Sequence, residues 1–346
     1  MIILWFLILL TVIVFVHEMG HYLIARLNGV KVEVFSIGFG RELFGINDKY
    51  GTRWKVCFIP LGGYVKFYGD ANLSSNLPDD KIKSLSEKEI NETFHIKSLK
   101  QKAAIVFAGP LANFIFAFLI FLFLFLVKGS PSDIKYYPII DNILENSAAS
   151  EAGFEIDDKV IMINGKQVDN FLDIRDIVIS NPSKEINFKI IRDGNIYDII
   201  AIPNPVELID ENGDKYINGR MGFSAKYETI YKKLTLKQAF SKSLSDTFSY
   251  TIKTFQGITD IVIGERSASE LGGPIMIASV ASKAANSGME SYLFIMAIIS
   301  INLGLINLFP IPLLDGGHLL LYGIQSVTKK TINESFLKYY YGMGMF

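Results

Sequence analysis

The chain has 346 residues, half of which are hydrophobic, and its mean hydropathy of +0.30 is high for a water-soluble protein. The formal net charge of −1 argues against nucleic acid as a partner, because no basic surface dominates. The single cysteine, Cys57, excludes an internal disulfide and a cysteine-rich zinc site. A metal site would therefore use carboxylates and some of the four histidines: His17, His21, His95 and His318.

Three apolar stretches predict membrane-spanning helices, at residues 2–26, 103–127 and about 292–309. The first could be a cleaved signal peptide, but it has no basic start before the apolar run and no small-residue cleavage site after it. We therefore expect a retained span. Residues 336–346 resemble the start of a fourth, but about eleven residues are too few to cross a bilayer. Either the chain is cut short there or its tail does not span.

The loops predict a topology and a division into four parts. Residues 26–102 carry 13 Lys and Arg against nine acids. The positive-inside rule therefore places this loop in the cytoplasm and the N-terminus outside. We expect a membrane part at 1–127, an extracytoplasmic region at 128–230 with a core at about 138–205, an amphipathic membrane-surface segment at 231–290, and a last part at 291–346.

The region after the second span has the pattern of a small α+β domain. Asn164-Gly165 and Asp193-Gly194 each lie between apolar runs and predict two tight hairpins, with a helix at 171–180 between them. The stretch "SAASEAGFEIDDKVIMINGKQV" resembles the PDZ domain. PDZ domains bind extended peptides by adding a strand to a sheet edge. A compact spacer without a ligand is the alternative.

The stretch "HEMGH" in the first span carries the most specific chemical signal. His17 and His21 are four residues apart, so a helix presents both on one face, where both rings can bind one Zn²⁺. Zinc lowers the pKa of a bound water to about 7, and Glu18 can take that water's proton during peptide hydrolysis. The motif arises by chance on the order of once in a hundred such sequences. A charge near the centre of a spanning helix costs roughly 2.5–3.5 kcal/mol, which a metal would offset.

A third metal ligand is expected where the third span breaks. Candidates are His95, His318 and any carboxylate at membrane depth. In "INLGLINLFPIPLLDGGHLLLYG", residues 301–323, Pro310 and Pro312 cannot continue the helix. Broken backbone at this depth is tolerated inside protein or along a wet cavity. Asp315 lies in the break, and so it is a candidate ligand.

With these two motifs, the sequence resembles the site-2 protease family of intramembrane zinc metalloproteases. The resemblance rests on HExxH in the first span together with N-x-x-P-x-P-x-x-D-G later, and the bacterial RseP-like branch with its PDZ insertion is most similar. Further family-like stretches are "SIGFG" (36–40), "PLGGYVKFYGD" (60–70), "FAGPLANF" (107–114) and "LGGPIMIA" (271–278). The resemblance covers nearly the whole chain.

The resemblance implies an α-helical membrane protein of three to four transmembrane helices, with a membrane-associated β-hairpin or sheet and an inserted α+β PDZ domain. It implies Zn²⁺ as the cofactor, held by His17, His21 and Asp315, with Glu18 as the catalytic base. His318 is an alternative to Asp315, and we expect no catalytic part for His95.

The resemblance also implies residues that bind substrate. Asn307 would act near the scissile bond, and residues 62–66 would pair with the substrate as an edge strand, chiefly through Gly62, Gly63, Tyr64 and Val65. Two roles are equally expected for Asn113: it forms an ordinary hydrogen bond between helices, or it lines the active-site cavity.

The expected function is an intramembrane zinc endopeptidase of the bacterial inner membrane, with the N-terminus and the PDZ domain outside the cytoplasm. Its substrates would be single-span membrane proteins already shortened by another protease, such as anti-sigma factors, or signal-peptide remnants. The alternative is a membrane-anchored PDZ scaffold with a catalytically silent zinc site. A transporter with intramembrane carboxylates is a third hypothesis, which the lack of paired repeats disfavours.

Overall fold

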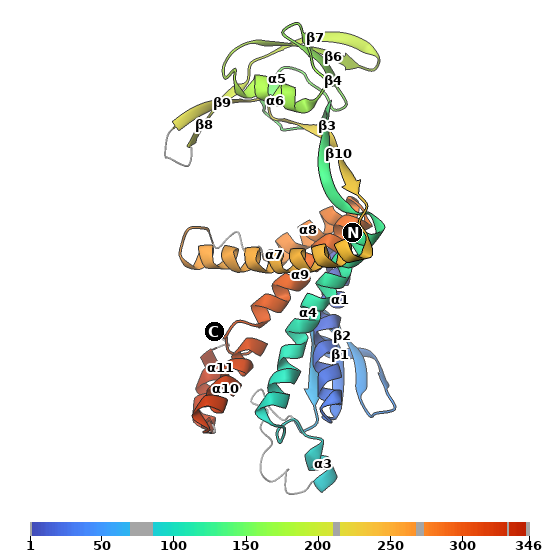
Figure 1. The fold of residues 1–346 in the computed structure, drawn as a ribbon, viewed down its shortest axis with the longest axis vertical. Helices are drawn as coiled ribbons and strands as arrows, with labels where there is room; N and C mark the ends of the chain where they lie inside the picture. The colour runs from blue at the N-terminus through green and yellow to red at the C-terminus, as the bar shows by residue number, and fades with distance from the viewer. Residues whose placement is uncertain (1, 70–85, 210–214, 268–272, 331, 344–346) are drawn as a thin grey trace. The chain divides into compact units, whose positions relative to one another are not determined.

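The computed structural model describes residues 2–69, 86–209, 215–267, 273–330 and 332–343. The described residues leave out Asp70, 271–272 and 344–346, which belong to stretches singled out above. The chain forms two compact units (Figure 1). Unit 1 contains Met1–Val127 and Leu234–Phe346, and unit 2 contains Lys128–Lys233.

Three helices of unit 1 are long and apolar enough to cross a membrane: α1 (Ile2–Leu27), α4 (Leu99–Val127) and α9 (Met289–Asn307). The three predicted apolar stretches are therefore helices of spanning length, as expected of an α-helical membrane protein. α4 begins a turn earlier than expected, because Ser98 and Gln101 cap its first turn through reciprocal hydrogen bonds. Both α1 and α9 pack against α4. Their shared core includes Ile13, Phe121 and Ile301.

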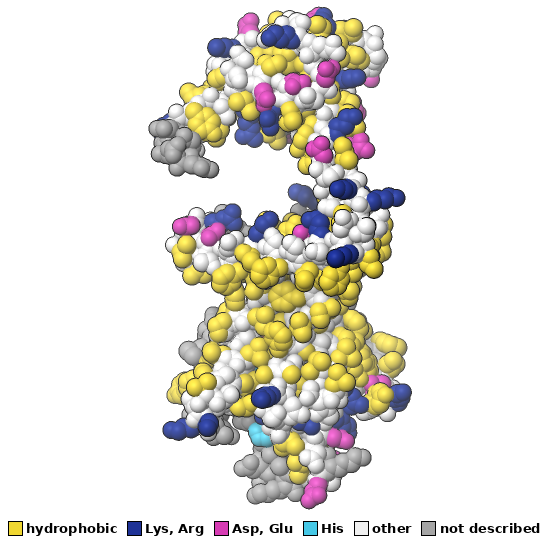
Figure 2. All heavy atoms as spheres, in the orientation of Figure 1, with side chains coloured by type: hydrophobic (Ala, Val, Ile, Leu, Met, Phe, Trp, Pro, Cys, Tyr) yellow, Lys and Arg dark blue, Asp and Glu magenta, His cyan; other side chains and the backbone are white. Residues whose placement is uncertain are grey.

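The outer surface of unit 1 is apolar where the long helices lie. Figure 2 shows hydrophobic side chains over the middle of this unit, with Lys and Arg at the level of α7 and again at the opposite end. Along α4, exposed large side chains recur at Phe107, Leu111, Ile115, Leu119 and Phe123. An exposed apolar row of this length is unfavourable in water and is stable in lipid.

A long hairpin, β1 (Val32–Asn47) and β2 (Arg53–Phe67), follows α1 and packs against it. Asp48 shapes its turn: the carboxylate accepts backbone N–H bonds from Tyr50 and Thr52 at 2.8 and 2.9 Å. It also accepts the Trp54 indole N–H at 2.9 Å and the Tyr22 hydroxyl of α1 at 3.2 Å. Burial raises the pKa of Asp48, but these hydrogen bonds outweigh it and hold the pKa below its ordinary value.

The rest of unit 1 is helical: α3 (Glu87–Asn91), α7 (Leu236–Val262), α8 (Pro274–Asn286), α10 (Asp315–Thr328) and α11 (Glu334–Met343). The amphipathic segment expected at 231–290 contains α7, which buries Ala239, Ser243 and Thr247 and exposes a row that includes Phe240 and Phe248. Its position at the membrane surface stays a prediction. Among the described residues α11 has ten, too few for a fourth span.

Unit 2 is an α+β unit with its own core. Its main sheet has the order β10-β3-β4-β6-β7, with β5 paired to β4. The strands are β3 (Ser130–Ile143), β4 (Lys159–Ile163), β5 (Lys166–Gln167), β6 (Ile186–Arg192), β7 (Asn195–Ala201) and β10 (Phe223–Lys232). A separate hairpin joins β8 (Asn204–Ile209) and β9 (Lys215–Arg220), and the helices are α5 (Ala148–Glu151) and α6 (Phe171–Ile179).

The local predictions for unit 2 are confirmed. Asn164 and Gly165 join β4 to β5 with φ of 48° and 78°, and Asp193 and Gly194 join β6 to β7 with φ of 49° and 79°. Positive φ at both central residues is the turn that a tight hairpin needs. The helix expected at 171–180 is α6. The sheet also contains β10, which lies beyond the expected core at 138–205. The PDZ identity of this unit stays a prediction.

Candidate metal centre

Two histidines of α1 and an aspartate of α10 converge inside unit 1. The Nε2 atoms of His17 and His21 lie 3.2 Å apart. Asp315 Oδ2 lies 3.2 Å from His17 Nε2 and 3.5 Å from His21 Nε2. The four-residue spacing therefore places both rings on one face of α1, as expected, and the carboxylate meets them from a distant part of the chain.

The proline-containing loop after α9 delivers Asp315 to this place. α9 ends at Asn307 and α10 begins at Asp315, so the predicted helix break is confirmed. The loop is tightly folded: a Cβ at Gly316 would lie 2.2 Å from the Leu308 carbonyl oxygen. Leu313 takes a φ of 75°, a conformation that is unusual outside glycine. This compact turn starts α10 with the carboxylate pointed at α1.

The second nitrogen of each histidine faces α4. His21 Nδ1 donates to the Ile105 carbonyl at 2.9 Å, which leaves Nε2 free of a proton and available as a ligand. His17 Nδ1 lies 3.2 Å from the side-chain nitrogen of Asn113. Partners of this kind hold ligating imidazoles in position.

The three side chains fit a zinc ion. Their ligand atoms all lie within 4.8 Å of one another, and within the described part of the chain they form the one group of three or more such residues. Asp315 Oδ2 is buried and accepts no hydrogen bond, an arrangement that is costly unless a cation compensates it. Two imidazoles and a carboxylate are ligands that zinc prefers, and three protein ligands are typical of catalytic zinc.

Comparison with known proteins identifies the family. A family model for "Peptidase family M50" matches residues 5–346. The chain belongs to this family.

Relatives of this M50 peptidase carry the name "putative zinc metalloprotease". The Mesorhizobium japonicum protein is 38% identical, with 98% of this chain and 93% of the relative covered. The Rickettsia conorii protein is 39% identical over 94% and 88%. The Campylobacter jejuni protein is 35% identical over 96% and 86%. The resemblance to site-2 proteases is confirmed, and the M50 peptidase is a zinc metalloprotease of the membrane.

A cavity of about 610 Å³ opens onto the three ligand candidates. Glu18 lines it together with Val65 of β2, which approaches Glu18 there. Gly63 allows this approach, because a Cβ there would lie 2.9 Å from a Val14 methyl and 3.2 Å from Glu18 Cγ. The other lining residues expected from the sequence are Gly62, Tyr64, Asn307 and His318.

The remaining candidates fall in different surroundings. His318 lines the cavity of the M50 peptidase but is not part of the three-ligand group. His95 is exposed. Asn113 is fully buried and is not among the cavity-lining residues. Sequence reasoning missed the Ile105 carbonyl, and no signal could have revealed it, because every residue has a carbonyl group.

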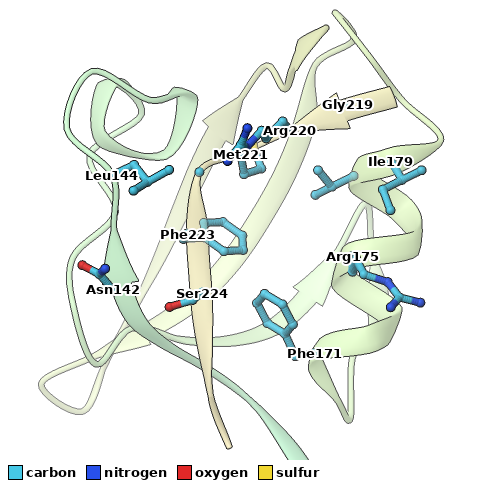
Figure 3. Close-up of a pocket in the computed structure, with 12 residues that line it drawn as sticks. Asn142, Leu144, Phe171, Arg175, Ile179, Gly219, Arg220, Met221, Phe223 and Ser224 are labelled. Carbon is cyan, nitrogen blue, oxygen red and sulfur yellow. The ribbon is translucent and has the colours of Figure 1, made fainter. Parts of the chain in front are cut away.

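Unit 2 has a cleft of its own, of about 390 Å³. Figure 3 shows it between α6 and the start of β10, with Phe171 on the helix and Phe223 on the strand facing the same space. Arg175 and Arg220 carry positive charge at the cleft, and Arg175 is paired with Asp176 on its own helix. β10 is an edge strand of the main sheet.

Proposed function

We propose that this M50 peptidase hydrolyses peptide bonds within the membrane-spanning segments of other proteins, and that His17, His21 and Asp315 hold its zinc. The observation that carries the proposal is the meeting of the two Nε2 atoms with Asp315 Oδ2, 3.2 and 3.5 Å away. The two histidines belong to a helix long and apolar enough to cross a membrane. Hydrolysis would therefore take place at a site surrounded by apolar helices.

Glu18 is the catalytic base in this proposal. His17, His21 and Asp315 would hold the zinc ion, which would supply Lewis-acid chemistry at the scissile carbonyl and lower the pKa of the attacking water toward neutrality. The Glu18 carboxylate takes a proton from the attacking water and passes it to the leaving amine nitrogen. Close packing of β2 at Gly63 against Glu18 keeps this side chain at the cavity wall.

The substrate strand would lie along β2 in the cavity. A helical segment hides its carbonyls in hydrogen bonds, so it must unwind before water can attack, and a strand pairing stabilises the unwound form. Gly62, Gly63, Tyr64 and Val65 supply backbone at the cavity wall, and the Asn307 amide can orient the substrate carbonyl from the other side. Asn307 lies at the last position of α9, eight residues before Asp315.

The substrates and topology follow the family resemblance. We propose single-span membrane proteins shortened by another protease, or signal-peptide remnants, in a bacterial inner membrane. Unit 2 would lie outside the cytoplasm as a PDZ domain, and the loop 26–102 inside. The unit 2 cleft would take an extended peptide beside β10, since an edge strand has unpaired backbone groups to offer.

The scaffold alternative is disfavoured because Glu18 lies in the wall of the same cavity as the three ligand candidates. The Glu18→Gln variant tests it. The amide keeps the shape of the side chain but cannot accept the proton, so we expect the variant to keep its zinc and to lose cleavage of a model membrane peptide. Cleavage at the unsubstituted rate would contradict the proposed protease mechanism.

A further inference from the structure

Asn113 is held firmly in the centre of unit 1. None of its surface is exposed. Its backbone carbonyl accepts a hydrogen bond from the Ser300 hydroxyl of α9 at 3.0 Å. Gly304, one turn further along α9, packs so closely that a Cβ there would lie 3.2 Å from Asn113 Cβ. Helix packing on two sides therefore fixes where the amide can reach.

The amide reaches the ring of His17. The side-chain nitrogen of Asn113 lies 3.2 Å from His17 Nδ1, while His17 Nε2 faces Asp315 Oδ2. A neutral imidazole carries one proton, and a ring that binds a cation through Nε2 carries that proton on Nδ1. His17 is 8% exposed, so the Nδ1–H cannot rely on bulk water and needs an acceptor inside the protein.

We propose that the side-chain oxygen of Asn113 accepts the Nδ1–H of His17 when zinc is bound, which makes Asn113 a positioning residue for a metal ligand. The inference rests on the proposed zinc site. In the structure the amide nitrogen faces His17, and a half-turn of the amide brings the oxygen to the same place. The oxygen is not held elsewhere, because Asn113 Oδ1 is buried without a hydrogen-bond partner.

His21 shows the same arrangement with a different acceptor. Its Nδ1 donates to the Ile105 carbonyl at 2.9 Å. Ile105 and Asn113 both belong to α4, eight residues apart. One helix would therefore orient both histidines through their Nδ1 atoms, opposite the Nε2 atoms that would bind the metal. Ile105 acts through its backbone and Asn113 through its side chain. Asn113 is therefore the partner that substitution can remove.

The test compares variants of the full chain in detergent, with zinc affinity measured by competition with a chelator. Leu has a similar shape to Asn but no acceptor, and loss of such a partner typically weakens metal binding about 10- to 100-fold. We expect that loss for Asn113→Leu. We expect Asn113→Asp, which keeps an acceptor oxygen at the same place, to bind zinc with nearly the affinity of the unsubstituted chain.

Asn302→Leu is the matched control. Asn302 also joins two helices of unit 1, by accepting a hydrogen bond from the Thr254 hydroxyl at 2.8 Å, but its amide bonds to Thr254 and not to a histidine. A merely structural role for Asn113 predicts that both leucine variants keep the same zinc affinity. Equal affinity of Asn113→Leu and the unsubstituted chain, or equal losses in the Asp and Leu variants, would overturn the inference.

A measurement on the unsubstituted chain covers the case in which a variant fails to fold. Nitrogen NMR of ¹⁵N-histidine-labelled, zinc-loaded protein reports which ring nitrogen carries the proton, with His95→Gln and His318→Gln used to remove the signals of the two histidines outside the ligand group. We expect Nδ1 of His17 to be protonated and hydrogen-bonded. A bare Nδ1 would overturn the inference while leaving the zinc site intact. Failure of the unsubstituted chain to bind zinc would instead contradict the proposed function.

Discussion

Gly109 lies directly against the ring of His21. A Cβ at Gly109 would lie 2.2 Å from His21 Nε2 and 2.9 Å from His17 Cε1, both closer than real contacts allow. α4 therefore has no side chain at the one position where both imidazoles need room. A glycine inside a helix destabilises it by about 0.5–1 kcal/mol relative to alanine. At Gly109 this loss of helix stability is the cost of leaving room for the two imidazole rings.

We predict that Gly109→Ala weakens zinc binding at least 10-fold, since the methyl group must displace a ligand ring from its position. Chelator competition on the purified chain measures the effect. Gly323→Ala, on α10, is the control, because a Cβ there meets nothing within 4 Å. That variant should bind zinc normally and be slightly more stable. Unchanged zinc affinity in Gly109→Ala would refute the assigned packing.

Asp48 is predicted to anchor the β1–β2 hairpin to α1. Asp48→Asn removes the charge that receives the Trp54 and Tyr22 hydrogen bonds, and bonds to charged groups contribute about 1.5–3 kcal/mol each when well shielded. We expect a lower thermal midpoint and slower peptide cleavage, because the hairpin carries Val65 to Glu18. Tyr22→Phe, which removes one of these bonds, should give a smaller effect.

The pH dependence of the Asp48 effect has a definite sign. Its pKa is lower in the folded chain than in the unfolded chain, so its contribution to stability is present above the unfolded value and is lost as pH falls through the folded value. The difference in thermal midpoint between the unsubstituted chain and Asp48→Asn should therefore shrink below about pH 4. If the difference in thermal midpoint stayed constant down to acid pH, the stabilisation by Asp48 would come from the shape of its side chain and not from its charge.

The cleft of unit 2 is predicted to bind extended peptides. Phe171→Ala removes a large apolar side chain from the cleft, and we expect it to weaken binding of random fluorescent peptides with free carboxyl ends. The neighbouring Leu172 is 40% exposed and does not line the cleft, so Leu172→Ala is the control. Fluorescence anisotropy on the full chain measures both. Equal binding by both variants would leave the spacer interpretation as the better one.

Much of the fold could be predicted because its signals are local. The three spans follow from runs of apolar residues, the two unit 2 hairpins from Asn-Gly and Asp-Gly pairs, and the end of α9 from Pro310 and Pro312. The pairing of β3 with β10 was not predicted. It pairs Ile143 with Phe223, eighty residues later, and no local feature of either strand's sequence predicts which strand it pairs with.

The candidate site divides in the same way. The spacing of His17 and His21 predicts a shared helix face, the helix break made Asp315 a candidate third ligand, and the family resemblance selected it. The surroundings of these residues depend on tertiary packing, which a single sequence does not encode locally. Gly109 beside His21, Gly63 beside Glu18 and the Ile105 carbonyl behind His21 became visible once α4 and β2 were placed against α1.

The most direct test of the account is the metal content of the purified chain and of its Asp315→Ala variant. We predict about one zinc per unsubstituted chain. We predict little or none in the variant, because a lost ligand leaves two histidines to hold the ion. Asp157→Ala, an exposed aspartate of unit 2, should keep its zinc. Full zinc occupancy in Asp315→Ala would contradict the central claim.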